Sequence, residues 1–298
     1  LEADAEEETR SENVMRRVRG MLGDEIEAEM EWISLYKFHS RSIRNFLHGH
    51  VIFIGDAAHQ VSPFGARGAN SGIQDAENLA WKLQLVLKEL APETLLDSYN
   101  AERTYAAEEN VQHSTQSTDF IVPKGEVSLV FRNAVLSLAK EYKFAIPLIN
   151  TGRLSTPTIH RESPLNTPDC DSWSGKLLPG APAVDAPVQT TRGKRWLLDQ
   201  LKGEFTLLYF TENSVQEDVE SEFRSLCEND IPVQPLVLGL NSEIKGVSVF
   251  DLQGIAAQRY DAQNGTTYLL RPDQHITARW KGYVSSAIYQ ALSRATCN

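Results

Sequence analysis

The sequence has few cysteines, and their spacing excludes two kinds of stabilising chemistry. It contains Cys170, Cys227 and Cys297, with no Cys-x-x-Cys pair among them. An odd number of widely spaced cysteines argues against a disulfide framework and against a zinc site. We therefore expect no metal site and a reducing, cytoplasmic environment.

The sequence also lacks long apolar runs and an excess of basic charge. Its most apolar stretches, residues 51–54 and 205–210, are far shorter than the roughly 20 residues of a membrane span. The formal net charge is −11, with no basic stripe, so neither nucleic acid nor an anionic membrane surface is an expected partner. A small molecule is the expected ligand.

The first residues lack the features of a natural N-terminus. The chain opens at Leu1 rather than at Met, and residues 1–8 are acidic, without the basic and apolar regions of a signal peptide. We expect the sequence to begin partway through a longer protein.

Hydrophobic residues make up 41% and charged residues 23% of the chain, as in soluble globular proteins. The patterning predicts an α/β fold with α+β elements. In the first half it predicts, in chain order, a helix at 6–22, strands at 29–38 and 51–54, and helices at 70–90, 92–117 and 129–142. The 51–54 strand is wholly apolar, which favours a parallel strand buried on both faces, and Ser71 and Gln74 have capping-box spacing.

A proline-rich and glycine-rich stretch, residues 155–192, is predicted to be a linker or an extended arm. Beyond residue 193, strands and helices alternate, which predicts a separate small α/β domain. The expected strands are 205–210, 233–238, 266–271 and 275–280, and the expected helices are 215–229 and 285–294. The predicted domains are therefore residues 1–154, 155–192 and 193–298.

One motif combines a strand, an acidic residue, a glycine loop and a helix. The apolar strand 51–54 leads into Gly55-Asp56-Ala57-Ala58-His59, and Pro63-Phe64-Gly65-Ala66-Arg67-Gly68-Ala69-Asn70 leads into the next helix. Gly65 and Gly68 let the backbone approach a flat ring. The N–H groups of Gly68, Ala69 and Asn70 at the helix start would stabilise an anion. Reduced flavin carries such a negative charge.

The run GDAAHQVSPFGARGANSGIQDAENLAWKL resembles the second FAD motif of the p-hydroxybenzoate hydroxylase-like aromatic-ring hydroxylases, most of all their 3-(3-hydroxyphenyl)propionate hydroxylase branch. Downstream, Leu95-Leu96-Asp97-Ser98-Tyr99-Asn100-Ala101-Glu102-Arg103 resembles the family's Leu-Leu-x-x-Tyr-x-x-Glu-Arg helix. The resemblance covers most of residues 30–120 and implies the C-terminal portion of an FAD-binding monooxygenase domain.

The resemblance implies roles for individual residues. Asp56, next to Gly55, would bind the ribityl chain of FAD. Gly65, Gly68 and Asn70, with Ala69, would hold the pyrimidine edge of the flavin, and the Pro63 carbonyl would face the ring near its reactive C4a atom. For Arg67, pairing with the flavin and facing solvent are both open.

The resemblance also implies an activity. In the family, NADH or NADPH reduces FAD, O2 adds at C4a, and the flavin hydroperoxide transfers one oxygen atom to a phenolic ring. The family's Gly-x-Gly-x-x-Gly segment is absent from this sequence, so we expect it in cis or in a separate chain, with the isolated chain inactive without it. Two alternatives stay open: a non-catalytic assembly module with a vestigial flavin loop, and another flavin-dependent oxidoreductase, such as an epoxidase, halogenase or reductase.

The last hundred residues resemble the thioredoxin-like domain that relatives of phenol hydroxylase carry. Where a thioredoxin has its redox cysteines, this chain has Thr211-Glu212-Asn213-Ser214, so thiol–disulfide exchange has no nucleophile. We expect a structural or subunit-contact role for this domain, with a homodimer left open.

Several polar and aromatic residues allow both a functional and a structural interpretation. Tyr36 and Phe38 alternate with polar residues as a substrate-facing wall would, although an aromatic strand also suits a plain core. For His59 we expect packing or capping. Glu102 and Arg103 are expected to form a structural ion pair or a helix cap.

Overall fold

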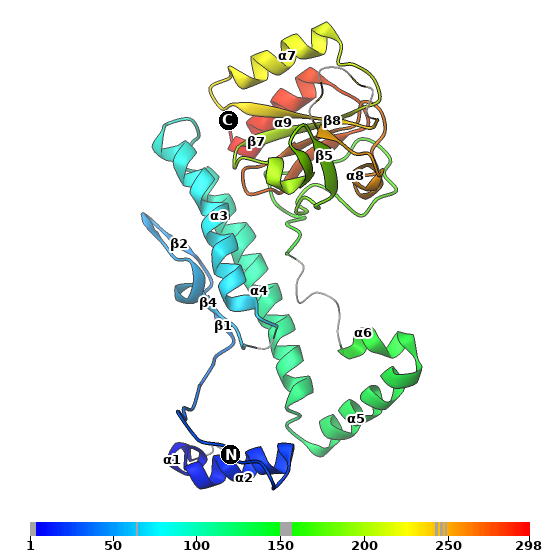
Figure 1. The fold of residues 1–298 in the computed structure, drawn as a ribbon. Helices are drawn as coiled ribbons and strands as arrows, with labels where there is room; N and C mark the ends of the chain where they lie inside the picture. The colour runs from blue at the N-terminus through cyan, green and yellow to red at the C-terminus, as the bar shows by residue number, and fades with distance from the viewer. Residues whose placement is uncertain (1–3, 64, 150–156, 242–243, 245–246, 248) are drawn as a thin grey trace. The chain divides into compact units, whose positions relative to one another are not determined.

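The computed structural model describes residues 4–63, 65–149, 157–241, 244, 247 and 249–298. The chain divides into two compact units, residues 1–39 and 40–298, which are described separately (Figure 1).

The N-terminal unit contains two helices, α1 (Ala5–Glu8) and α2 (Ser11–Leu22), neither with a buried side chain. The Asp4 carboxylate accepts a hydrogen bond from the N–H of Glu6 at 3.0 Å and caps α1. The helix expected over residues 6–22 is therefore interrupted, at Thr9, whose hydroxyl bonds to the Ala5 carbonyl at 2.7 Å.

The strand expected at residues 29–38 is wrong, because this segment has no regular structure. A strand needs a hydrogen-bonded neighbour, and the other described residues of this unit supply helices and turns only. Trp32 and Tyr36 are 81% and 72% exposed. The aromatic alternation here does not reflect a sheet face.

The second unit begins with short antiparallel strand pairs that carry the flavin-like motif. Strand β1 (Arg41–Ser42) pairs with β4 (His59–Gln60), and β2 (Leu47–His48) pairs with β3 (Val51–Ile52). The parallel, doubly buried strand expected at 51–54 is wrong: β3 is antiparallel, and Val51 is 57% exposed. Among the described residues it pairs only with β2, and a two-stranded hairpin leaves a face uncovered.

Two long helices, α3 (Arg67–Leu87) and α4 (Leu95–Ile121), lie side by side (Figure 1). Helix α3 starts and ends three residues earlier than expected. Its buried face is mostly polar, since Arg67, Ser71, Asp75, Asn78 and Lys82 are buried with Trp81. The apolar residues that suggested an amphipathic helix are partly exposed, Ile73 by 60% and Leu87 by 74%.

Helix α4 is followed by α5 (Glu126–Glu141), η2 (Lys143–Ala145) and α6 (Ile146–Ile149). Helix α5 agrees with the expectation of a helix at 129–142. No helix in the described ranges combines the length and apolar character needed to cross a membrane.

The C-terminal part is a seven-stranded mixed sheet in the order β11-β10-β7-β8-β9-β5-β6. Strands β7 and β8 are parallel, and β10 runs antiparallel to β7 and β11. The strands are β5 (Pro187–Thr190), β6 (Gly193–Trp196), β7 (Phe205–Thr211), β8 (Val233–Gly239), β9 (Val249–Phe250), β10 (Thr267–Leu270) and β11 (Ile276–Trp280). The helices are η4 (Leu198–Gln200), α7 (Glu217–Cys227), α8 (Ile255–Arg259) and α9 (Ser285–Thr296).

Alternation along β7 divides the core between the two sheet faces. Phe205 and Leu207 join a cluster with residues of α7 and α9, whereas Leu208 and Phe210 join one with residues of α8 and β5. Trp81 of α3 belongs to the first cluster and meets Phe205 edge-on, with ring centroids 5.5 Å apart. The flavin-motif helices and the sheet therefore share a core.

Residues 157–192, expected to be a linker or arm, pack against the sheet. The N–H of Thr167 bonds to the Thr277 carbonyl at 2.8 Å, that of Gly180 bonds to the Ile276 carbonyl at 2.7 Å, and Leu165 is fully buried. The segment ends in β5, which is a strand of the sheet. The α/β fold class is confirmed, while the domain boundaries stay a prediction.

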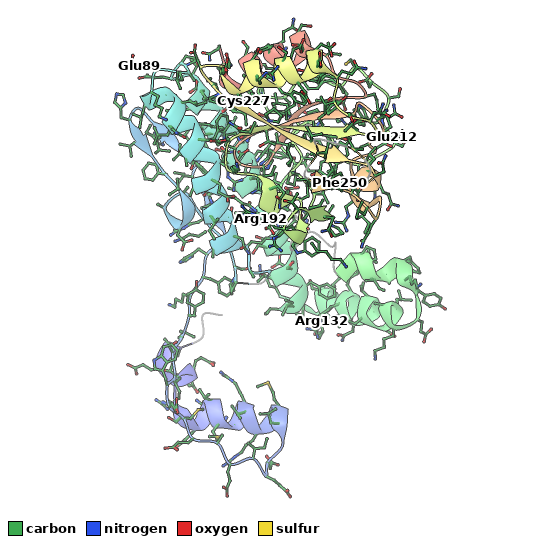
Figure 2. All side chains as sticks on the ribbon, turned by 45° about the horizontal axis from the view of Figure 1, so that its top comes forward. Glu89, Arg132, Arg192, Glu212, Cys227 and Phe250 are labelled. Atoms are coloured by element: carbon green, nitrogen blue, oxygen red, sulfur yellow. The ribbon has the colours of Figure 1, made fainter. Side chains whose placement is uncertain are left out.

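Figure 2 draws the side chains as sticks on the ribbon and labels Cys227 in this part. Cys227, like Cys170 and Cys297, is a free and exposed cysteine. Strand β7 ends at Thr211, whose hydroxyl donates to the Asn213 carbonyl at 2.7 Å. The resemblance of this part to a thioredoxin-like domain stays a prediction.

Candidate flavin site

The Gly55-Asp56 turn is packed directly on helix α3. Gly55 begins a short 3-10 turn, η1 (Gly55–Ala57), with a φ of 55°. A Cβ atom on Gly72 of α3 would lie 3.4 Å from the Gly55 Cα atom. The left-handed φ of Gly55 favours glycine there, and Gly72 places α3 in van der Waals contact with the turn.

Asp75, three residues beyond Gly72 on α3, joins three other parts of this region. Its Oδ2 atom accepts hydrogen bonds from the Gly55 N–H at 2.9 Å and from His59 Nε2 at 2.7 Å, and its Oδ1 atom accepts one from Arg103 Nε at 2.6 Å. Burial alone would raise the pKa of Asp75, but the hydrogen bond from His59 and the charge of Arg103 hold it below its ordinary value. Asp75 is therefore ionised at neutral pH.

His59 has the packing role expected from the sequence. Its ring is buried and stacks on Phe46, with ring centroids 5.7 Å apart, while Nε2 binds Asp75. Asp56, in contrast, is exposed and lines a hollow of about 250 Å³ together with Arg41 and Ser42. The Asp56 carboxylate forms no hydrogen bond or ion pair with any part of the chain that the structure describes.

The start of α3 has unusual geometry. Its N-cap residue, Ala66, is left-handed with φ 52° and ψ 37°, and no side chain caps the helix. The expected capping box is wrong: Ser71 lies inside the helix, where its hydroxyl accepts from Asn110 at 3.2 Å. The amide of Asn70 donates to the Ala66 carbonyl at 2.8 Å.

A cavity of about 510 Å³ adjoins this helix start. Its lining comes from the loop before α3 and the first turns of that helix, from Asn110 of α4, and from Pro157 and Thr158. The loop and helix residues are Gly65, Ala66, Arg67, Asn70, Ser71, Ile73, Gln74 and Glu77. The guanidinium of Arg67 is buried and donates to Asn110 Oδ1 at 2.5 Å. Arg67 is therefore held by the protein and does not simply face solvent.

The structure brings some of the expected site residues together and separates others. Gly65, Arg67 and Asn70 line the large cavity, and Gly68 and Ala69 belong to the same first turn of α3. Asp56 lines the smaller hollow, and Pro63 is exposed. Tyr36 and Phe38 belong to the other unit, with ring centroids 6.2 Å apart. The roles of all these residues stay predictions.

Sequence reasoning missed Ser71, Asp75 and Asn110. A signal was present: Arg67, Ser71 and Asp75 recur every four residues, which places them on one helix face. The apolar period of the same helix masked this polar stripe.

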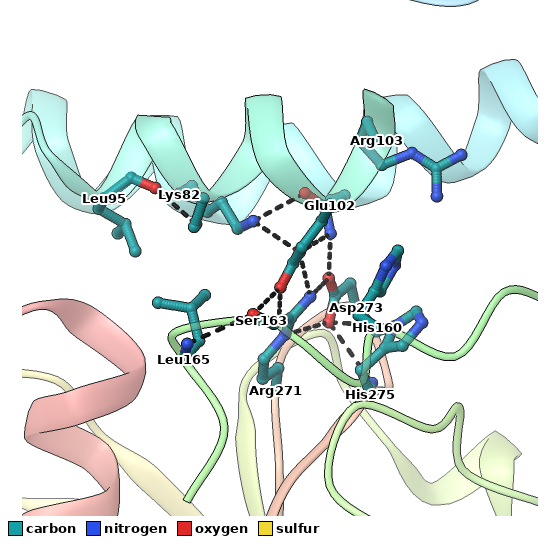
Figure 3. A network of polar contacts seen from close by, with 12 residues as sticks. Lys82, Leu95, Glu102, Arg103, His160, Ser163, Leu165, Arg271, Asp273 and His275 are labelled. Atoms are coloured by element: carbon teal, nitrogen blue, oxygen red, sulfur yellow. Dashed lines mark hydrogen bonds and ion pairs between the residues drawn. The ribbon is translucent and has the colours of Figure 1, made fainter. Parts of the chain in front are cut away.

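A second buried network joins α3 and α4 to the sheet (Figure 3). Glu102 of α4 accepts hydrogen bonds from Lys82 at 2.9 Å and from two nitrogens of Arg271 at 2.6 and 3.0 Å. Arg271 also binds Asp273, at 2.5 and 3.0 Å. Asn78 of α3 donates to both Glu102 and Asp273, at 2.7 and 3.0 Å.

Charge in this network is balanced. Burial would raise the pKa of Glu102, but Arg271 and Lys82 hold it well below its ordinary value. Burial lowers the pKa of Lys82 to about 8, opposed by the charge of Glu102. Two cations therefore face two carboxylates at neutral pH.

Glu102 and Arg103 both form structural ion pairs, as expected, but each pairs with other residues and not with its neighbour. Arg103 points away from the Glu102 cluster (Figure 3) and binds Asp75 and Ser71 instead. Consecutive helical residues project about 100° apart, so the two side chains enter different networks.

Comparison with known proteins supports a flavoprotein. Residues 2–114 match the family model described as "FAD binding domain". Over 274 residues the chain is 27% identical to a "Probable NADH-specific resorcinol 4-hydroxylase" of Rhodococcus jostii (strain RHA1), covering 92% of this chain and 48% of the relative. Over 129 residues it is 35% identical to a "3-(3-hydroxy-phenyl)propionate/3-hydroxycinnamic acid hydroxylase" of Paraburkholderia xenovorans (strain LB400), covering 43% and 21% of the two chains.

A solved structure shares the fold. The flavin-dependent monooxygenase PieE, in complex with FAD and substrate, aligns with a TM-score of 0.78 at 22% identity, covering all of this chain and 56% of PieE. These two matches extend over most or all of this chain, but the chain spans only about half the length of either protein. The resemblance seen in the sequence is thereby confirmed: the match to an FAD binding domain and the names of the relatives support the FAD-dependent aromatic hydroxylase family.

Proposed function

We propose that residues 40–158 form the flavin-ring side of the FAD site of an aromatic hydroxylase, which uses NADH or NADPH and O2 to hydroxylate a phenolic substrate. The observation that supports this most directly is the cavity of about 510 Å³ at the start of α3, lined by Gly65, Arg67 and Asn70.

The residues at this cavity fit the pyrimidine edge of a flavin. Helix α3 has no side-chain cap, so the N–H groups of its first turn are available to a ligand. Gly65 has a φ of 98°, which lets the loop backbone turn close to a ring. The helix dipole stabilises negative charge by about 0.3–2 kcal/mol, which suits a reduced flavin.

Each residue has a separate task in this proposal. Arg67, fixed by Asn110, supplies a buried positive charge at the cavity. Asp56 has a free, exposed carboxylate that can accept hydrogen bonds from ribityl hydroxyls. Bound FAD would supply the redox and oxygen-transfer chemistry. The protein must orient it and exclude water from the cavity.

The relatives' names support the reaction class. One is described as an NADH-specific resorcinol 4-hydroxylase and another, from Burkholderia sp., as a 4-methyl-5-nitrocatechol 5-monooxygenase. Both names specify phenolic rings. We therefore propose a phenol as the substrate and a nicotinamide as the reductant.

Titration of the purified chain with FAD, followed by quenching of flavin fluorescence, tests the binding part. Asp56→Asn should raise the Kd about 10- to 100-fold, because a hydrogen bond to a charged group contributes about 1.5–3 kcal/mol. Asp97→Asn, an exposed position on α4, is the matched control and should leave the Kd unchanged. Absence of FAD binding, or equal Kd values for all three proteins, would contradict the proposal.

The reaction part needs a second assay. NADH or NADPH oxidation by the complete FAD-loaded protein, with the Gly-x-Gly-x-x-Gly segment present, is measured with a panel of phenols, catechols and resorcinols. A phenol that stimulates oxidation and is recovered with one added oxygen supports hydroxylation. If no member of the panel stimulates oxidation by the complete protein, the proposed ring hydroxylation is wrong.

A further inference from the structure

We propose that Asp75 is a positioning residue that fixes the Gly55-Asp56 turn on helix α3 and thereby holds the Asp56 carboxylate in place for the ribityl chain of FAD. The ligand part of this inference rests on the proposed function. The fixing of the turn does not, since it concerns contacts within the chain alone.

Three donors from three different places meet at Asp75. The Gly55 N–H belongs to the turn, His59 Nε2 to β4, and Arg103 Nε to α4, at 2.9, 2.7 and 2.6 Å. The Asp75 side chain is fully buried. Each donor therefore has a fixed direction, and no water competes for the carboxylate at its surface.

The segments on both sides of the turn are anchored: the Phe53 carbonyl accepts from the Tyr99 hydroxyl at 2.7 Å and the Ala58 carbonyl from the Ile43 N–H at 2.9 Å. Asp56 is exposed and bonds to no residue in the described ranges, so its own side chain does not anchor it. Gly55 has a φ of 55° and lies against Gly72 without side-chain packing. Within the turn itself, the Gly55–Asp75 hydrogen bond is the polar contact to α3 among the described residues, and His59 adds a second one just after the turn.

Loss of the Asp75 charge affects two of its partners, the Arg103 guanidinium and the Gly55 N–H. Asparagine at position 75 would leave Arg103 a buried cation with no ionic partner among the described residues. It would also offer one acceptor oxygen in place of two, so that oxygen could not serve both the Gly55 N–H and Arg103 Nε in their present positions. A buried donor without an acceptor costs about 1–3 kcal/mol. We expect the turn to open locally while the sheet stays folded, because the sheet has its own core.

Hydrogen exchange tests the fixing of the turn without any flavin. In Asp75→Asn, exchange of the Gly55 amide should be at least tenfold faster than in the unaltered chain, while amides of β7 and β8 keep their rates. Asp97→Asn is the control for removal of one carboxylate. Unchanged exchange at Gly55 would overturn the proposal.

A double-variant cycle tests the action of Asp75 through Asp56. Asp75→Asn should raise the Kd for FAD about tenfold in the unaltered chain and leave it unchanged in an Asp56→Ala background. A purely structural role would instead raise the Kd by the same factor in both backgrounds, which would overturn the positioning of Asp56. If the unaltered chain binds no FAD, the proposed function fails, and the exchange experiment still decides whether Asp75 fixes the turn.

A second variant serves if Asp75→Asn fails to fold, as judged by circular dichroism. Gly72→Val keeps every charge but places side-chain atoms against the Gly55 Cα atom, because a Cβ alone would lie 3.4 Å from it. The same faster exchange at Gly55 and the same loss of FAD affinity are expected. Normal exchange and normal affinity in this variant would contradict the inference.

Discussion

Removal of the Arg271 guanidinium should cost a large part of the free energy of unfolding. The side chain is fully buried and makes two hydrogen bonds to Glu102 and two to Asp273. In Arg271→Met, Lys82 would be the one lysine or arginine still paired with these two buried carboxylates among the described residues, with Asn78 as a neutral donor to both. Breaking a buried ion pair in this way costs about 3–5 kcal/mol, against a total stability of about 5–15 kcal/mol for a typical protein.

The magnitude depends on charge balance, which a second substitution can restore. Glu102→Gln in the Arg271→Met background leaves one cation, Lys82, facing one carboxylate, Asp273. The double variant should therefore lose less stability than the sum of the single variants, by about 0.5–3 kcal/mol. If the stability loss of the double variant equals the sum of the losses of the two single variants within experimental error, the residues of this network are not energetically coupled.

Urea unfolding followed by circular dichroism and tryptophan fluorescence measures these losses. Trp81 is a natural reporter, because the Arg271 guanidinium lies 5.5 Å from its ring centroid. Arg192→Met, at an exposed turn (Figure 2), is the control, and it should change stability by less than about 0.5 kcal/mol. A cost below about 1 kcal/mol for Arg271→Met would contradict the reasoning.

Three further predictions concern single residues. Burial lowers the pKa of His160 from 6.5 to about 3. Between pH 6.5 and about 3, the His160 imidazole therefore binds a proton in the unfolded chain but not in the folded chain. Stability should then fall by up to about 1.4 kcal/mol per pH unit as pH decreases from 6.5 toward 3, and His160→Gln should flatten this slope in urea titrations at several pH values. Gly180→Ala should destabilise the chain by more than about 1 kcal/mol in the same assay, because φ is +90° and a Cβ would contact the His160 carbonyl. Glu89→Gly should raise the melting temperature, since Glu89 follows α3 with a φ of 58° (Figure 2), a left-handed conformation that costs a non-glycine residue about 1–2 kcal/mol; an unchanged or lower value would contradict this.

The sequence predicts the C-terminal sheet better than the helices that precede it. Strand β7 was expected at 205–210 and spans Phe205–Thr211, because a strand buried on both faces is a short apolar run with clear ends. The short strands β6 and β9 carry no such pattern and were missed. Residues 29–38 have the composition of a strand, but composition does not supply a pairing partner.

The candidate site shows a similar division. The glycine loop and Asp56 are recognisable because their spacing is local. Glu102 and Arg271 are separated by 169 positions, and Asn78 and Asp273 by 195. Such pairs leave no periodic signal in either segment, so the polar face of α3 could be found only once the chain was folded.

The adjacent positions of Glu102 and Arg103 limit how α4 can vary in length. Insertion of one residue between Leu95 and Glu102 would turn both side chains by about 100° relative to the start of the helix. Arg103 would then be displaced from Asp75, and Glu102 from Arg271, in a single step. Insertions and deletions that persist in this helix should therefore lie beyond Asn110, where neither network contributes a side chain, and an exchange of C-terminal sheets between relatives should succeed only when residues 78, 82 and 102 are exchanged together with the sheet.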